Sequence, residues 1–292
     1  MYDVFLYGTA DGYLLEYDSR PSEAPSLVSY LKRHVLRSKV KFRNVTDEYD
    51  VWAAWGSSHD DAWETQREWK RARSGAIEPV WTESLGWPWG SQDYAIHDRR
   101  AVKMGRRLLV RKGDLPQDKA THDLVSNEEY ILHRISNGVP EGIVDVPPMQ
   151  AFPMDSNLDV MGGLDFRKGC YVGQELTVRT YHTGVVRKRI LPITIHHSQE
   201  PNMLPSYSLP EHLDVKAVSV NAEKLGARPR GSGKLLSNQN GFGLALLRLE
   251  HVASFFAGDV RFEFETLDGT KLSATPWWPD WWPHEAHDSS QE

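Results

Sequence analysis

Cysteine is nearly absent from this sequence, because Cys170 is the only one among 292 residues. A single thiol excludes an intramolecular disulfide and a metal site built from several cysteines of one chain. Long apolar runs are absent too, since no stretch approaches the roughly 18 residues of a membrane-spanning helix. We therefore expect no membrane partner.

An excess of positive charge is also missing. The chain has 34 Lys and Arg residues against 40 Asp and Glu residues, which gives a formal net charge of −6. Proteins that bind nucleic acids usually present a basic face to the phosphates, so we expect no nucleic-acid partner. The nucleotide-binding motifs G-x-G-x-x-G and G-x-x-x-x-G-K-[ST] do not occur either. The chain opens in a strand-like run without a targeting segment, as expected of a cytosolic protein or of a processed product.

The first part of the chain alternates strand and helix patterns. An Asp-Gly turn between apolar runs predicts a hairpin from Tyr2 to Tyr17, and helical spacing predicts a helix from Ser26 to Arg37. Strand patterns return from Val40 to Val45 and from Tyr49 to Trp55. Residues 56–90 are rich in charge, Trp, Gly and Pro, and we interpret them as an insertion outside the core.

The rest of the chain predicts a second lobe and a barrel. We expect a strand from Arg106 to Arg111, and a helix from Asn127 to Ser136 capped by Ser126 and Glu129 in S-x-x-E spacing. Six short β-runs with glycine turns follow Gly184 and predict an antiparallel barrel. The expected domains are residues 1–110 as an α+β lobe, residues 111–184 as a second α+β segment, and residues 185–292 as a barrel with a Trp/Pro-rich tail.

Positive charge gathers in one segment. Six basic residues and one acidic residue lie between Phe166 and Ile190, against the trend of the whole chain. Such a cluster suits an anion or an acidic partner, although a solvated helix face has the same composition. Cys170 lies inside it, between two glycines and before a predicted helix start at Gly173. Cations and a helix N-terminus favour thiolate over thiol, whereas a lone cysteine is also often a small buried apolar residue.

The segment around this cysteine matches a known signature. Residues 168–179, KGCYVGQELTVR, resemble the K-G-C-[FY]-x-G-Q-E-x-x-x-R motif of the folate-binding, glycine-cleavage T-protein-like family. The matching positions are Lys168, Gly169, Cys170, Tyr171, Gly173, Gln174, Glu175 and Arg179. The mitochondrial branch of that family comprises iron-sulfur cluster assembly factors for 4Fe-4S proteins, which in fungi are often labelled transferases.

Three other segments resemble the same family. Pro153 to Asp159 is similar to its P-L-E-x-N-L stretch, with Asp155 where Glu is usual. Residues 98–107 resemble its D-P-R-x₄-G-x-R, and residues 130–142 resemble its Y-x₃-R-x₃-G-x-P-E-G. The resemblance implies an α+β fold in which two α+β lobes and a C-terminal antiparallel β-barrel form a three-lobed ring around a central folate channel. The family normally has a further N-terminal segment before the hairpin, so we expect an incomplete first lobe.

Folate chemistry suggests specific contacts. A reduced pterin presents adjacent N–H donors to a carboxylate, and its glutamate tail needs cations. Asp155 is our candidate for the first role, and Arg179 with Arg187 for the second. A turn or helix cap would also explain Asp155, and an intramolecular ion pair would also explain Arg179.

The resemblance implies a function in the mitochondrial matrix. Cys170 would supply one thiolate to a 2Fe-2S cluster shared with an A-type scaffold protein, because one cysteine cannot hold a cluster alone. The protein would be a monomer by itself and a heterodimer with the scaffold. The alternative is a folate-dependent one-carbon or aminomethyl transferase, for which we assign no catalytic residue, so enzymatic turnover stays open. A third hypothesis is a reactive cysteine activated by His182.

Overall fold

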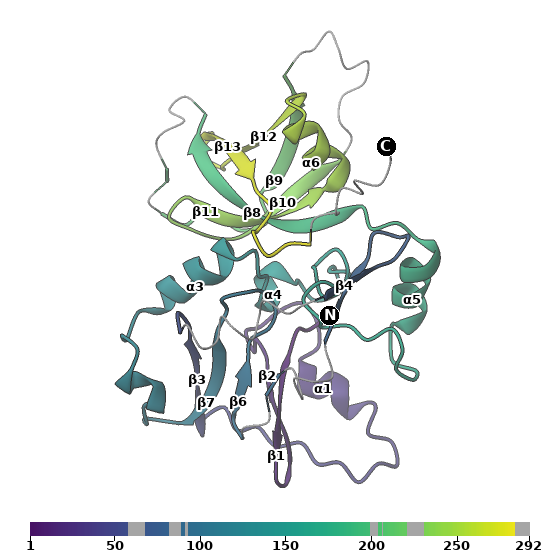
Figure 1. The fold of residues 1–292 in the computed structure, drawn as a ribbon, viewed down its shortest axis with the longest axis vertical. Helices are drawn as coiled ribbons and strands as arrows, with labels where there is room; N and C mark the ends of the chain where they lie inside the picture. The colour runs from purple at the N-terminus through teal and green to yellow at the C-terminus, as the bar shows by residue number, and fades with distance from the viewer. Residues whose placement is uncertain are drawn as a thin grey trace.

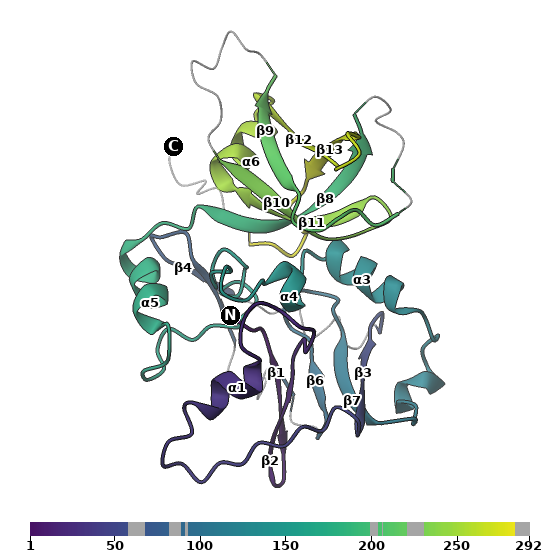
Figure 2. The same cartoon turned by 180° about the vertical axis from the view of Figure 1, so that it is seen from behind.

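The computed structural model describes residues 1–57, 68–81, 89–90, 93–198, 204–205, 207–220 and 231–283. A β-barrel occupies one end of the molecule and a mixed α/β part occupies the other (Figures 1 and 2). Among the described residues, no helix has the length and apolar character needed to cross a membrane.

The predicted N-terminal hairpin is confirmed. It consists of β1 (Phe5–Thr9) and β2 (Gly12–Glu16), with Tyr7 buried on its inner face. The ring of Phe5 lies under the guanidinium groups of Arg100 and Arg107, at 4.5 and 4.6 Å. The hairpin therefore packs on a cluster of charged residues.

The segment after the hairpin is less regular than predicted. Helix α1 (Leu27–Lys32) is capped by Ser26 and ends five residues before the predicted Arg37. The predicted strand from Val40 to Val45 does not form, because these residues are mostly exposed and have no neighbouring strand to pair with. Strand β3 (Tyr49–Ala54) then pairs with β7 (Arg106–Arg111), which also pairs with β6 (Ala95–His97).

Part of the supposed insertion belongs to the core. Within residues 56–90, β4 (Glu68–Arg71) and β5 (Ile77–Val80) form a hairpin. Ala76 and Ile77 are buried, and Ile77 packs in a cluster with Val160 and Met161. The prediction of an insertion outside the core is therefore wrong for residues 68–80, whose charged side chains obscured a buried turn. Residues 58–67 and 82–88 of this segment lie outside the described residues.

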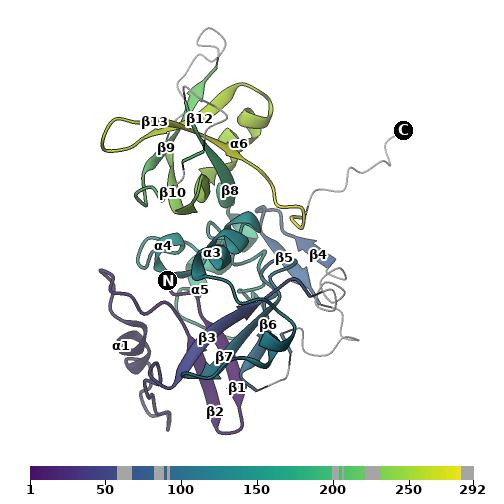
Figure 3. The ribbon, with the colours of Figure 1, turned by 90° about the vertical axis from the view of Figure 1, so that its left-hand side faces the viewer.

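Four helical segments connect this sheet to the barrel. They are η2 (Gln117–Ala120), α3 (Asn127–Ser136), α4 (Gly142–Asp145) and α5 (Gln174–Thr183). Helix α3 has the predicted bounds, but the Ser126 side chain makes no cap hydrogen bond to the helix backbone. Figure 3 shows α3 between the barrel and the β3-β7-β6 sheet, whereas α5 lies beside β4 (Figure 1).

The predicted antiparallel barrel is confirmed. All six β-runs form strands, which close in the order β10-β11-β8-β13-β12-β9. Their bounds are β8 (Lys188–His197), β9 (Asp214–Ser219), β10 (Ser232–Gln239), β11 (Phe242–Arg248), β12 (Val260–Glu265) and β13 (Lys271–Pro276), with α6 (Leu249–Phe256) after β11. Apolar residues of alternating register fill the interior, among them Leu191, Ile193, Val215, Leu235 and Phe262. The tail packs Trp282 against the α/β part and Trp278 against both parts.

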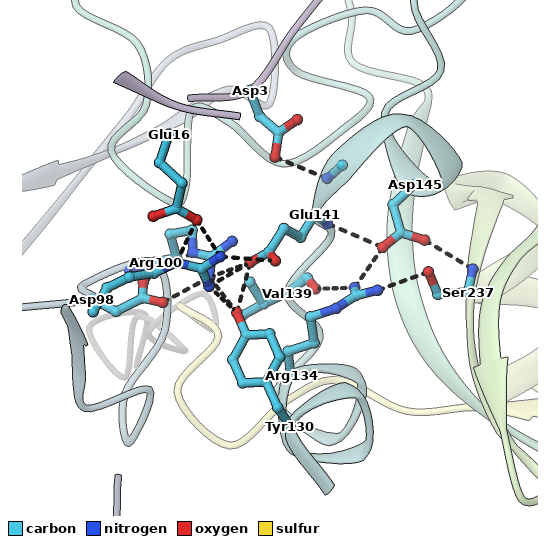
Figure 4. Close-up of polar contacts among 12 residues, drawn as sticks. Asp3, Glu16, Asp98, Arg100, Tyr130, Arg134, Val139, Glu141, Asp145 and Ser237 are labelled. Carbon is cyan, nitrogen blue, oxygen red and sulfur yellow. Dashed lines mark hydrogen bonds and ion pairs between the residues drawn. The ribbon is translucent and has the colours of Figure 1, made fainter. Parts of the chain in front are cut away.

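A buried polar network joins the α/β part to the barrel (Figure 4). Arg134 on α3 donates to Asp145 on α4 at 2.5 Å and to the Ser237 hydroxyl on β10 at 2.8 Å. Asp145 also accepts from the amides of Ser237 (2.8 Å) and Glu141 (3.0 Å). The side chains of Arg134 and Asp145 are almost fully buried, so each charge needs the opposite charge of the other to offset its loss of hydration.

We expect Asp145→Asn to destabilise the protein by about 3–5 kcal/mol, since it removes the carboxylate that pairs directly with the buried Arg134 charge. Denaturant titration measures this change in the free energy of unfolding. Asp214→Asn is the matched control, because Asp214 pairs with Lys234 on the surface and should cost no more than about 1 kcal/mol. Equal losses in the two variants would contradict a structural role for the buried pair.

Candidate functional site

Cys170 lies in the loop directly before α5, and its side chain is exposed. The helix begins after Gly173, which acts as the N-cap residue with φ +86. That left-handed conformation is strained for residues with a side chain, so the glycine of the signature has a backbone reason to be there. Cys170 therefore precedes the N-cap of a helix by three residues, and the start of that helix lies where the sequence predicts it.

The loop is held in place on both sides of the cysteine. The Tyr171 amide donates to the Gln174 side chain at 3.3 Å, and the Lys168 ammonium lies 4.7 Å from the centre of the Tyr171 ring. Upstream, the Phe166 ring stacks on Tyr181 of α5 with centres 4.0 Å apart. These contacts fix the loop while the thiol remains accessible.

The β4–β5 hairpin also holds the cysteine loop and α5 in place. The Tyr181 hydroxyl donates to Glu78, which is buried on β5 and also accepts from Arg167 at 3.4 Å. Burial, together with the Glu78 carboxylate, raises the pKa of Tyr181 to about 12. The residues that sequence reasoning assigned to an insertion thus support the cysteine loop, and only the long-range contact reveals this.

The remaining signature residues lie on the outer side of the loop and helix. Gly169 is exposed with open space around its Cα, and Glu175 is exposed in the first turn of α5, where a negative charge suits the helix dipole. Arg179 is exposed and forms no ion pair with a described residue. His182 lies in the last turn of α5, about 12 Å along the helix axis from its start, so direct proton exchange with Cys170 is not supported.

Two of the three folate candidates meet in one cavity. Asp155 and Arg187 line a cavity of about 330 Å³ between α5, the 152–155 segment and the first strand of the barrel. Its other lining residues are Phe152, Pro153, Met154, Leu176, Thr177, Thr180, Val185, Lys188 and Arg248. Burial raises the pKa of Asp155, whereas Lys188 and Arg189 oppose that shift. Arg179 is not among the lining residues, so the structure does not bring it together with Asp155.

A second cavity, of about 720 Å³, was not identified from the sequence. It lies between β3 and residues 115–127, with Arg107, Tyr130 and Glu141 in its wall. These three residues belong to the motif segments 98–107 and 130–142 and form one charged cluster. Tyr130 and Glu141 of this cluster are labelled in Figure 4. Tyr130 donates to Glu141 at 2.7 Å, while Arg100 lies 2.8 Å from the same carboxylate.

Electrostatics explains why this cluster tolerates burial. Burial alone would raise the pKa of Glu141, but Arg107 and Arg100 hold it well below the usual range. Arg107 also pairs with Glu16 of the hairpin, and Arg100 pairs with Asp98 at 2.7 Å. Because the charges satisfy one another, the motif residues can remain buried in the cavity wall.

Comparison with known proteins gives consistent matches. Residues 187–284 match the family model described as the CAF17 C-terminal beta-barrel domain. The chain is 38% identical over 271 residues to the mitochondrial iron-sulfur cluster assembly factor IBA57 homolog of Cryptococcus neoformans, covering 86% of this chain and 71% of that protein. It is 37% identical to the protein of the same name from Mycosarcoma maydis, covering 97% of this chain and 71% of that protein. The Coccidioides immitis homolog is 36% identical, with 94% of this chain and 64% of that protein covered.

We expect Tyr181→Phe to loosen the cysteine loop while preserving the stack with Phe166. The variant removes one buried hydrogen bond to Glu78 and should cost about 1–3 kcal/mol. Hydrogen–deuterium exchange should become faster in residues 164–183. Tyr13→Phe is the control, since Tyr13 is 71% exposed. If the Tyr181→Phe variant exchanges in this segment as slowly as the wild type does, the Glu78 contact does not secure the loop.

Proposed function

Because the chain belongs to the family of mitochondrial iron-sulfur cluster assembly factors named IBA57, we propose that it assists the assembly of mitochondrial iron-sulfur proteins and that Cys170 ligates the cluster in transit. The observation that carries this proposal is the accessible thiol on a fixed loop at a helix N-terminus. A thiol sealed inside the apolar core could not reach a cluster held by another protein.

To ligate a cluster, this protein needs a partner protein that supplies further ligands. A 2Fe-2S cluster takes four protein ligands, typically four cysteine thiolates, and this chain has one cysteine. Cys170 would lose its proton as its sulfur binds iron, and the partner would supply the other ligands. The role of the family implies interaction with other iron-sulfur assembly proteins. We propose that the protein that shares the cluster is a cysteine-bearing A-type scaffold.

We expect a coloured heterodimer when the protein is mixed anaerobically with a cluster-loaded A-type scaffold. Cys170→Ser should abolish it, because an alcohol is a poor ligand for iron at neutral pH. Absorbance combined with size-exclusion chromatography measures both colour and mass. His182→Ala is the control, since His182 is exposed at the other end of α5. A coloured complex that survives Cys170→Ser would falsify the ligand role.

We propose further that the 330 Å³ cavity binds a reduced folate. Its half-buried Asp155 would accept the pterin N–H donors, while Arg187 and Lys188 would neutralise the glutamate tail. The raised pKa of Asp155 supports this, because a carboxylate that pays a desolvation cost without a strong internal partner is typical of binding sites. Bound folate would supply a one-carbon acceptor, which is what the transferase alternative requires. Turnover of an aminomethyl donor with tetrahydrofolate would favour that alternative.

We expect Asp155→Asn to weaken tetrahydrofolate binding by about 10-fold to 100-fold, as measured by calorimetry. The same change should raise the melting temperature at pH 7. The folded-state pKa of Asp155 lies above its unfolded value, so protonation stabilises the fold and this contribution is lost as the pH rises through the folded pKa. The gain should vanish at acidic pH. Weaker binding together with a lower melting temperature at pH 7 would instead indicate structural damage.

A further inference from the structure

Large apolar side chains are exposed beside the cysteine. Val172, two residues after Cys170, is 65% exposed. Leu176 in the first turn of α5, which also lines the 330 Å³ cavity, is 42% exposed. Arg179 follows Leu176 by three residues, so the two side chains are neighbours on the helix surface. Lys168 is exposed on the other side of the thiol. We call these four residues the α5 face.

The cations of this face differ from two arginines of their segment, which have carboxylate partners. Between residues 166 and 190, Arg189 is buried against Asp159 at 2.5 Å, and Arg167 pairs with Glu78 at 3.4 Å. Lys168 and Arg179, in contrast, form no ion pair with any residue in the described ranges. Lys168 contacts the Tyr171 ring, which leaves its charge unneutralised. Structural roles thus account for the buried arginine but not for these two exposed cations.

The chemistry of the cargo complements this charge. Two ferric ions, two sulfides and four thiolates sum to a net charge of about −2 for an oxidised 2Fe-2S site. Glu175 is the acidic residue within this stretch of α5, and it lies in the first helical turn.

We propose that the α5 face is the docking surface for the cluster-bearing partner, whose own face is apolar beside its cluster and acidic at the rim. The inference rests on the proposed function, because Cys170 lies between Lys168 and Val172 along the chain. Val172 and Leu176 form the apolar centre that excludes water, and they govern the lifetime of the complex. Lys168 and Arg179 lie at the rim, where charges mainly accelerate association and make it sensitive to salt.

Two variants test the two parts of the surface separately. Leu176→Asp should weaken binding of the cluster-loaded A-type scaffold about 10-fold at both low and high KCl, because it buries a charge at the centre. Arg179→Glu should weaken binding about 5-fold at low KCl and have little effect at high KCl, where salt screens the rim. Both positions are exposed, so both variants should fold, and Leu176 also lies in the first turn of α5, where an acidic residue suits the helix dipole.

Matched controls lie on the barrel. Leu267→Asp changes a leucine that is 93% exposed in the turn between β12 and β13. Lys271→Glu reverses an exposed cation on β13 that forms no ion pair with a described residue. Both controls should bind the scaffold within about 2-fold of wild type, because neither lies on the α5 face.

The outcomes separate this inference from the proposed function. If wild type forms the coloured complex and Cys170→Ser loses it, but Leu176→Asp and Arg179→Glu bind like the controls, only the docking surface is overturned. If wild type forms no coloured complex, the proposed function fails and the surface fails with it. Light scattering of the protein alone adds a third outcome, since a dimer that Leu176→Asp dissociates would assign the face to a second copy and overturn the proposal.

Discussion

The buried pair of Arg189 and Asp159 holds three distant segments together. Arg189 on β8 donates to Asp159 at 2.5 Å, to the Met154 carbonyl at 2.7 Å and to the Gly75 carbonyl at 2.9 Å. Asp159 also accepts from the Ile77 amide at 2.9 Å. The side chains of both residues are almost inaccessible, so removal of either partner would leave a charge without compensation. These contacts therefore fix the positions of the barrel, the β4–β5 hairpin and the 153–159 segment relative to one another.

The arrangement of the functional site follows from this pair. Met154 precedes Asp155, and Lys188 precedes Arg189, so the same contacts bring the cavity carboxylate and a cavity cation together. Asn157 adds two hydrogen bonds with the Ile190 backbone, at 2.7 and 3.3 Å. The hairpin fixed by Asp159 also carries Glu78, which holds α5 through Tyr181. The 330 Å³ cavity and the cysteine loop, both of which adjoin α5, are thus held by the same set of contacts.

The parts that sequence predicted well depend on local patterns. The barrel strands, α3 and the start of α5 follow from alternation, helical periodicity and a glycine before the helix, all of which act within a few residues. The missing strand from Val40 to Val45 had the right side chains but no partner strand. The hairpin at residues 68–80 was misjudged for the opposite reason, since its burial depends on Asp159 and on Met161, some eighty residues away in sequence. The signature singles out Cys170 as a candidate, whereas the support from Glu78 could not be read from any local pattern.

The distribution of arginine partners also separates structure from function. Arg100, Arg107, Arg134 and Arg189 are buried and matched by carboxylates, and each of them joins segments that are remote in sequence. A buried guanidinium without such a partner would be too costly to retain, so these residues are explained by the fold alone. Lys168, Arg179 and Arg187 carry the same charge but lie on the surface around one helix in a protein of net charge −6. Folding does not require positive charge at these positions, and the anionic ligand and partner proposed for the cavity and the cysteine loop would account for it.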